Sequence, residues 1–280
     1  MWPFKSPPTV PVLRLAGPIG MATPLRPGLS IGLISGALDK AFSMSKLPAV
    51  AIVVNSPGGS PVQSNLIMKR VRQLAEDRQK KVYVFCEDVA ASGGYYLAVA
   101  GDEIYADTSS IIGSIGVIAA GFGFNKAIEK IGIDRRVYTA GHSKSTLDAF
   151  QPEKSEDVER IKQIQKDIHD AFIGVVKDRR AGKLTVQDSQ LFNGEFWAAP
   201  KALEYGLIDG VSDVRTKMRE LFGDKVRLRV VPIAPSGLLG RLRRTPTYDL
   251  SRAERNEAFS IGDELLSTLE ARLLWSRFGL

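Results

Sequence analysis

Short apolar runs alternate with amphipathic stretches along most of this chain. Continuous apolar runs at residues 50–54 and 82–85 predict two strands, the second of them buried. Apolar residues at helical spacing predict helices at 31–42 and 61–75, and a long helix that begins near Ser155. This alternation predicts an α/β fold, with a mainly parallel sheet and flanking helices.

Shorter elements complete this pattern. They are predicted helices at 92–100 and 124–130 and predicted strands at 103–105, 115–118 and 136–138. Asn55 and Cys86 end two of the predicted strands, and the carboxyl ends of parallel strands meet at one edge of a sheet. We therefore expect a functional site at that edge.

The segment after the 82–85 strand contains a serine at a strand-to-helix turn. Ser92 is followed by Gly93 and Gly94 and then by an apolar helix. A serine there projects into a cleft, glycines let a substrate backbone approach, and helix amides face incoming negative charge. The alternative is a glycine-rich turn whose serine only caps the helix.

Two further segments favour the nucleophile. The loop from Asn55 to Gly59 follows a strand and contains a glycine pair, a geometry that leaves adjacent backbone amides free for an oxyanion hole. Lys144 lies in a small polar segment, and a lysine whose pKa is lowered by burial acts as a general base toward serine. The alternative for Lys144 is an ordinary solvated loop lysine.

Together these segments resemble the signal peptide peptidase A family, the serine–lysine peptidases of the ClpP/crotonase superfamily. The resemblance covers roughly residues 10–214 and is close at several separated places. The matching segments are 12–19, 55–59, 91–96, 108–117, 141–150, 192–197 and 202–209. Asn193 and Glu195 stand where the family often has arginine or threonine, and neither matches a catalytic group.

The resemblance implies a role for each matching residue. Ser92 matches the nucleophile and Lys144 the general base, while Ser114 matches the serine that orients the lysine. The backbone amides of Gly59 and Gly93 match the oxyanion hole. A hydroxyl suits the orienting role because it accepts a hydrogen bond from lysine without adding a carboxylate that would raise the lysine pKa. The alternative for Ser114 is a plain turn residue.

The resemblance also implies an activity, a ClpP/crotonase-like fold and an assembly. We expect a serine endopeptidase without cofactor or metal, in the short single-domain form of the family. Its expected substrates are extended apolar peptides such as signal-peptide remnants, and its expected state is a homo-oligomer that encloses the sites. The alternatives are a non-catalytic scaffold or membrane-assembly partner and a crotonase-type acyl-CoA enzyme. The presence of both Ser92 and Lys144 disfavours the alternatives.

The remaining chemistry-bearing residues suggest no competing site. The single cysteine, Cys86, ends an apolar strand and is predicted to be a core residue. The segment around His142 does not resemble a Ser-His triad, and His169 falls in the helix pattern of residues 158–176 as a surface or packing residue. Asp88 is predicted to cap a turn. Composition is that of a globular chain, with 280 residues, 44% hydrophobic and 25% charged.

The formal net charge of +7 suits an anionic membrane surface better than nucleic acid. Basic residues are scattered, apart from a cluster at 241–244, and no aromatic-rich basic strand accompanies them. No apolar run approaches the ~18 residues of a transmembrane helix. The first residues lack the apolar core of a secretory signal. We therefore expect a cytoplasmic protein, with peripheral contact at the inner membrane face as a further option.

The chain is expected to divide into three parts. Residues 1–9 form an N-terminal extension, 10–232 the peptidase domain, and 233–280 a linker and an amphipathic helical tail. An apolar stripe with flanking arginines runs along that tail, and its residues are Ile261, Leu265, Leu269, Arg272, Leu273, Trp275 and Arg277. Such a helix either packs on protein or lies on a membrane surface.

Overall fold

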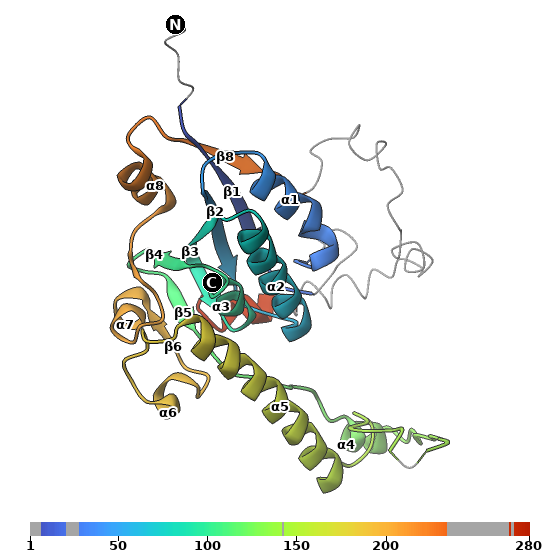
Figure 1. Cartoon of the computed structure of the whole chain (residues 1–280). Helices are drawn as coiled ribbons and strands as arrows, with labels where there is room; N and C mark the ends of the chain where they lie inside the picture. Colours follow the sequence, from blue (N-terminus) through green and yellow to red (C-terminus); the bar gives the residue numbers. More distant parts are fainter. Residues whose placement is uncertain (1–6, 21–27, 142, 234–268, 270–271) are drawn as a thin grey trace, which may run out of the picture.

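The computed structural model describes residues 7–20, 28–141, 143–233, 269 and 272–280. These residues form one sheet of eight strands whose main path runs β6-β5-β3-β2-β1-β8, with β4 pairing β3 and β7 (Figure 1). The strands are β1 (Thr9–Ala16), β2 (Ala49–Ser56), β3 (Lys81–Ala91), β4 (Glu103–Ala106), β5 (Ile111–Gly113), β6 (Phe196–Ala198), β7 (Gly210–Val211) and β8 (Arg227–Val231). All these pairings are parallel except that of β5 with β6.

Helices cover both faces of the sheet. They are α1 (Ile31–Ser43), α2 (Pro61–Asp77), α3 (Gly93–Ala98), α4 (Asn125–Lys130), α5 (Ser155–Arg179), α6 (Asp188–Leu191), α7 (Ala199–Glu204) and α8 (Val214–Phe222). Figure 1 shows α1, α2 and α3 on one side of the sheet and α8 on the other. The long helix α5 runs away from the sheet, and α4 lies at its far end.

Two apolar layers hold the sheet between the helices. Successive residues of a strand point to opposite faces, so Val50 and Ile52 of β2 join the larger cluster with α1, α2 and α3. Ala51 and Val53 join a smaller cluster that includes Met218 of α8. Burial on both faces explains why these strands are continuous apolar runs in the sequence.

The predicted α/β class with a mainly parallel sheet is confirmed. The helices predicted at 31–42 and 61–75 are α1 and α2, and Ser30 and Ser60 accept hydrogen bonds from the first-turn amides of these helices. The strands predicted at 115–118 and 136–138 are wrong, because neither segment pairs with another strand. The strand in the first region is β5, which ends before residue 115.

The expected tail is described only in part. The basic cluster at 241–244 and most of the apolar stripe lie outside the described residues. The end of the chain is described, and Phe278 is buried there against Val89 and Ala91 of β3. Leu269 and Leu273 of the same stripe are exposed.

Candidate active site

Ser92 occupies the turn between β3 and α3. Its backbone has φ 52° and ψ −123°, a left-handed conformation that L-residues adopt only at a cost. The turn is held because the Ser92 amide donates to the Gly113 carbonyl at 2.8 Å and the Ser92 carbonyl accepts from the Tyr96 amide at 3.0 Å. Strain of this kind concentrates at functional sites, and here it presents a half-buried hydroxyl at the carboxyl edge of the sheet.

The glycine loop after β2 lies directly against this turn. A Cβ added at Gly58 would stand 2.8 Å from the Ser92 Cβ, so only glycine permits this approach. Gly93 is equally confined, since a Cβ there would meet the Ser64 hydroxyl at 2.6 Å. The backbone of the loop and the start of α3 are therefore in contact around the serine.

A short strap, the segment at Ile19, holds the glycine loop from its other side, and the sequence did not predict this contact. The Ile19 amide donates to the Gly58 carbonyl at 2.9 Å, and the Ser60 amide donates to the Ile19 carbonyl at 2.8 Å. Gly59 between them has φ +139°. Within the described part of the chain, the amides of Gly59 and Gly93 have no hydrogen-bond acceptor. Two free amides beside a serine are what a backbone oxyanion hole requires.

Ser114 follows β5 as Ser92 follows β3. Ala91 pairs with Gly113 in parallel register, so the two serines come next on neighbouring strands, whose usual spacing is about 4.8 Å. Ser114 is buried, has φ 52° like Ser92, and its amide donates to the Glu195 carbonyl at 2.7 Å. The structure thus brings Ser92, Ser114 and the two glycine amides together.

Lys144 is exposed and lies apart from this group. It belongs to an arm, residues 117–141 and 143–154, that extends to the far end of α5 (Figure 1). Its neighbour Ser143 accepts a hydrogen bond from Arg160 at 3.1 Å, whereas Ile115, next to Ser114, contacts His169 at 3.0 Å. From Arg160 to His169 the helix advances nine residue positions, a rise of about 14 Å. One chain by itself does not place the lysine beside the serine.

Asp88 has a role that differs from the predicted turn cap. Its carboxylate accepts a hydrogen bond from the side-chain amide of Asn55 at 2.6 Å. The side-chain Oδ1 of Asn55 in turn accepts from the Val89 amide at 3.2 Å. The only sequence signal for this contact was the position of Asn55 at the end of a strand.

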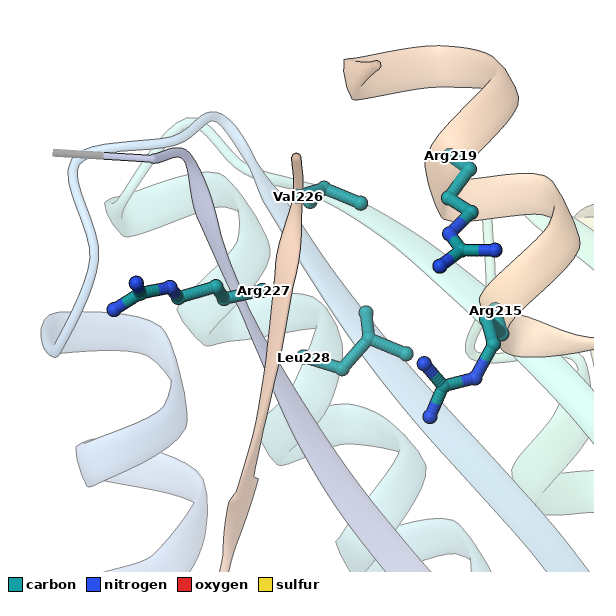
Figure 2. A pocket seen from close by; sticks show the side chains of 5 residues that line it. All are labelled: Arg215, Arg219, Val226, Arg227 and Leu228. Atoms are coloured by element: carbon teal, nitrogen blue, oxygen red, sulfur yellow. The ribbon is translucent and has the colours of Figure 1, made fainter. Parts of the chain in front are cut away.

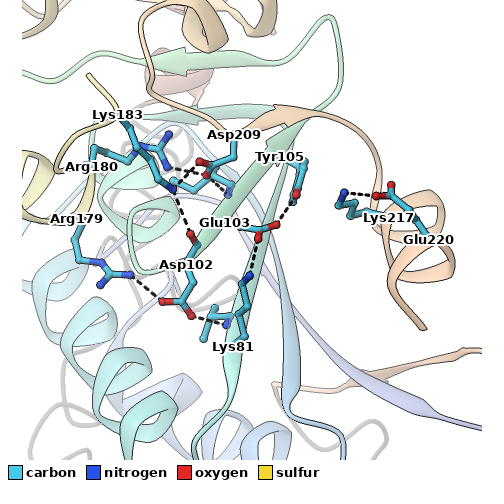
Figure 3. A network of polar contacts seen from close by, with 12 residues as sticks. Lys81, Asp102, Glu103, Tyr105, Arg179, Arg180, Lys183, Asp209, Lys217 and Glu220 are labelled. Carbon is cyan, nitrogen blue, oxygen red and sulfur yellow. Dashed lines mark hydrogen bonds and ion pairs between the residues drawn. The ribbon is translucent and has the colours of Figure 1, made fainter. Parts of the chain in front are cut away.

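A buried hydrogen bond holds α3 in place, and Figure 3 shows the nearby polar network around Asp209. The buried Tyr95 hydroxyl donates to the Leu207 carbonyl at 2.8 Å. Arg180, which is 2% exposed, donates to the neighbouring Gly206 carbonyl at 2.6 Å and to Asp209 at 2.7 Å. Burial acts to raise the pKa of Asp209, but hydrogen bonds from Arg180 and Lys183 outweigh it and hold that pKa below its usual value.

Cys86 is buried, and burial raises the pKa of its thiol to about 12. The prediction that it is a core residue is confirmed. In the described ranges, no three His, Cys, Asp or Glu side chains gather as metal ligands would. No helix in those ranges is long and apolar enough to cross a bilayer.

A separate hollow of about 330 Å³ lies between α8 and β8, far from the serine (Figure 2). Arg227 of β8 pairs with Thr9, the first residue of β1, so the hollow is at the edge where strands begin. Ser92 lies at the opposite edge. The residues that line the hollow are Arg215, Arg219, Val226, Arg227 and Leu228. Figure 2 shows that Arg227 points away from the two arginines of α8.

The parallel sheet, the strained serine and the glycine loop define an α/β protein with a ClpP/crotonase-like fold. The family model for peptidase family S49 matches residues 74–225. A candidate protease of Synechocystis sp., slr0021, is 30% identical over 249 residues, which are 86% of each chain. This chain therefore belongs to peptidase family S49.

Other relatives match only part of their own length. The "Na(+)/H(+) antiporter NhaA" of Brucella abortus is 53% identical over 273 residues, which are 97% of this chain and 37% of that protein. The chloroplastic serine protease SPPA of Arabidopsis thaliana is 31% identical over 204 residues, 71% of this chain and 29% of that protein. The chain thus spans little more than a third of the Brucella relatives it matches.

Proposed function

We propose that this protein is a serine endopeptidase that cleaves peptide bonds with a Ser92–Lys144 dyad. The observation that carries the proposal is the contact between the strained serine and the glycine loop. The amides of Gly59 and Gly93 beside it have no acceptor among the described residues. Membership of a peptidase family supports the same activity.

The proposed chemistry follows from these groups. The Ser92 Oγ attacks the peptide carbonyl carbon while its proton passes to Nζ of a neutral Lys144. The carbonyl oxygen becomes an oxyanion that the amides of Gly59 and Gly93 stabilise by hydrogen bonds. The C–N bond then breaks, Lys144 returns the proton to the leaving amine, and water later hydrolyses the ester on Ser92 by the same proton route.

We propose that Lys144 reaches Ser92 of another copy of this chain. The arm holds the lysine away from its own serine, so the dyad is incomplete in one chain. The arm also exposes large apolar side chains that no described residue covers. They are Ile118, Phe122, Ile131, Ile133 and Tyr138, with exposed fractions from 54% to 91%. Apolar surface of this kind is typical of a subunit interface, which supports the expected homo-oligomer.

In such an assembly Ser114 would orient the incoming lysine. Its position next to Ser92 on the neighbouring strand suits a hydroxyl that accepts from an ammonium. The buried surroundings of the serine turn would lower the pKa of a lysine inserted there, because desolvation disfavours its charged form. The interface would thereby create the base as well as deliver it.

The proposed substrates are extended apolar peptides with small side chains near the cut, such as remnants of signal peptides. This part of the proposal rests on the family resemblance and on relatives that are named proteases. A panel of extended peptides that differ in the residue before the cut tests it. Equal rates of cleavage for peptides with a charged residue and with a small apolar residue at that position would contradict the proposed preference.

The activity is tested by reaction with a fluorophosphonate probe that acylates nucleophilic serines, followed by mapping of the adduct. We expect labelling of Ser92 in wild-type protein and none in Ser92→Ala. That variant should also lose peptide cleavage by at least about 1000-fold while keeping its thermal unfolding temperature. An adduct elsewhere, or an active Ser92→Ala protein, would overturn the assignment.

A further inference from the structure

The pairing of β2 with β3 shifts just before the candidate site. Val54 pairs with Cys86, but Ser56 pairs with Ala90. Three residues of β3 therefore stand opposite the single residue Asn55 of β2. This is a β-bulge, a device that re-aims the chain beyond it.

The bulge decides which residue faces the serine. If the register of Val54 and Cys86 continued without a shift, Ser60 would stand opposite Ser92. In the shifted register Gly58 stands there instead, in agreement with the 2.8 Å between a Cβ built at Gly58 and the Ser92 Cβ. The two-residue displacement is about 7 Å along the strand. Without it the glycine loop and the nucleophile would not meet.

The Asn55 side chain spans the bulge and uses both ends of its amide. Its Nδ2 donates to the Asp88 carboxylate at 2.6 Å, and its Oδ1 accepts from the Val89 amide at 3.2 Å. Both partners are bulge residues. Strand β2 ends at Ser56, one residue after Asn55, and the glycines follow it. The nucleophile lies four residues after Asp88. The pair therefore fixes both parts of the site relative to each other.

We propose that Asn55 and Asp88 are positioning residues that hold the oxyanion amides against the nucleophile. This inference rests on the proposed peptidase function. Asp88 is exposed and Asn55 only half-buried, so their hydrogen bond contributes little to global stability. Its loss should therefore change the geometry at Ser92 more than the stability of the fold.

The two side chains permit a reciprocal exchange. In Asn55→Asp, a carboxylate replaces the amide that donates to Asp88. The hydrogen bond between residues 55 and 88 is lost, and their two carboxylates repel each other. Adding Asp88→Asn to that variant restores the pair with donor and acceptor exchanged, and residue 55 still accepts from the Val89 amide. Asp88→Asn alone keeps a neutral acceptor for Asn55 and should be mild.

The experiment measures the rate of Ser92 acylation by the fluorophosphonate probe, kcat and KM on a peptide, and the thermal unfolding temperature. We expect Asn55→Asp to lower the acylation rate and kcat by about tenfold or more, with KM and unfolding temperature nearly unchanged. The exchanged double variant should recover to within about threefold of wild type. The matched control is Glu87→Gln, next to Asp88 on β3. It removes an ion pair with Arg14 of β1 and should behave as wild type.

The outcomes separate the positioning role from the proposed activity. An acylation rate of wild-type size in Asn55→Asp would overturn the inference. So would a double variant as slow as Asn55→Asp, or a loss of rate that only follows a lower unfolding temperature. Failure of the wild-type protein to label at Ser92 would instead overturn the peptidase function on which the inference rests.

Discussion

Gly59 and Ile19 form a parallel β-bridge in which no side chain fits on the glycine. A Cβ at Gly59 would stand 2.1 Å from the Ile19 carbonyl oxygen, and its φ of +139° also disfavours any L side chain. The bridge presses the loop after β2 against the first residues that follow β1. The orientation of the Gly59 amide thus depends on a segment about 40 residues away in the chain.

Gly59→Ala should therefore displace the loop and remove an oxyanion donor. We expect peptide cleavage to fall by at least about 100-fold, and the free energy of unfolding to fall as well, because backbone must shift. Activity assays and urea unfolding measure both. The control is Gly36→Ala in α1, where a Cβ meets nothing within 4 Å and should stabilise by about 0.5–1 kcal/mol. Wild-type cleavage in Gly59→Ala would exclude this amide from the site.

A dyad shared between copies predicts complementation. Ser92→Ala and Lys144→Ala should each be inactive alone, because each copy lacks one half of the dyad. When the two proteins are unfolded together and refolded as a mixture, sites with an intact serine and lysine should form. Cleavage measured in the mixture should return to a sizeable fraction of wild type. A mixture that stays inactive although it forms mixed oligomers would contradict a shared dyad.

The Arg180–Asp209 pair predicts a defined acid sensitivity. The pKa of Asp209 is lowered in the folded protein, so its stabilising effect is present above the unfolded value of about 3.9. This effect is lost as pH falls through the lower folded value. Asp209→Asn should cost about 3 kcal/mol at pH 7, since Arg180 is left buried without a counter-charge, and should weaken the pH dependence below 4.

Urea unfolding at pH 7 and between pH 4 and 2 measures this effect. Asp188→Asn is the control, because it removes an ion pair with Lys177 in which both side chains are exposed. That change should cost less than about 1 kcal/mol. Equal losses of stability in the two variants would show that burial of Arg180 does not increase the cost of removing its counter-charge.

The end of the chain should contribute to stability and not hang free. Phe278 is 8% exposed and contacts Val89 and Ala91 of β3, the strand that leads to Ser92. Its ring meets the Phe196 ring edge-on, with the ring centroids 5.0 Å apart. Phe278→Ala should lower the free energy of unfolding by about 3 kcal/mol, as for other buried phenylalanines. Leu280→Ala, at a residue 58% exposed, should change it by less than about 0.5 kcal/mol. Denaturant titration measures both changes in unfolding free energy. Equal changes would show that Phe278 does not pack on the sheet.

The strands at the centre of the sheet were predictable because their signal is local. Residues 50–54 and 82–85 are continuous apolar runs, which is what burial on both faces of a parallel sheet requires. The segment 115–118 is also apolar, and Ile115 is buried, yet it forms no strand. Even within this segment Ile118 is exposed, so apolar character alone decides neither burial nor strand formation. A strand also needs a partner with free backbone groups, and no local pattern reports that.

The sequence by itself determined the α/β alternation and the position of Ser92 and the glycine loop at strand ends, since chain order and parallel pairing bring such ends to one edge. Tertiary structure alone decided the bulge in β3 that places Gly58 opposite Ser92, and the strap from Ile19. It also placed Lys144 on the arm at the amino-terminal end of α5, away from Ser92. These are contacts between segments distant in the chain, set by register and helix direction, and hydrophobic periodicity carries no information about either.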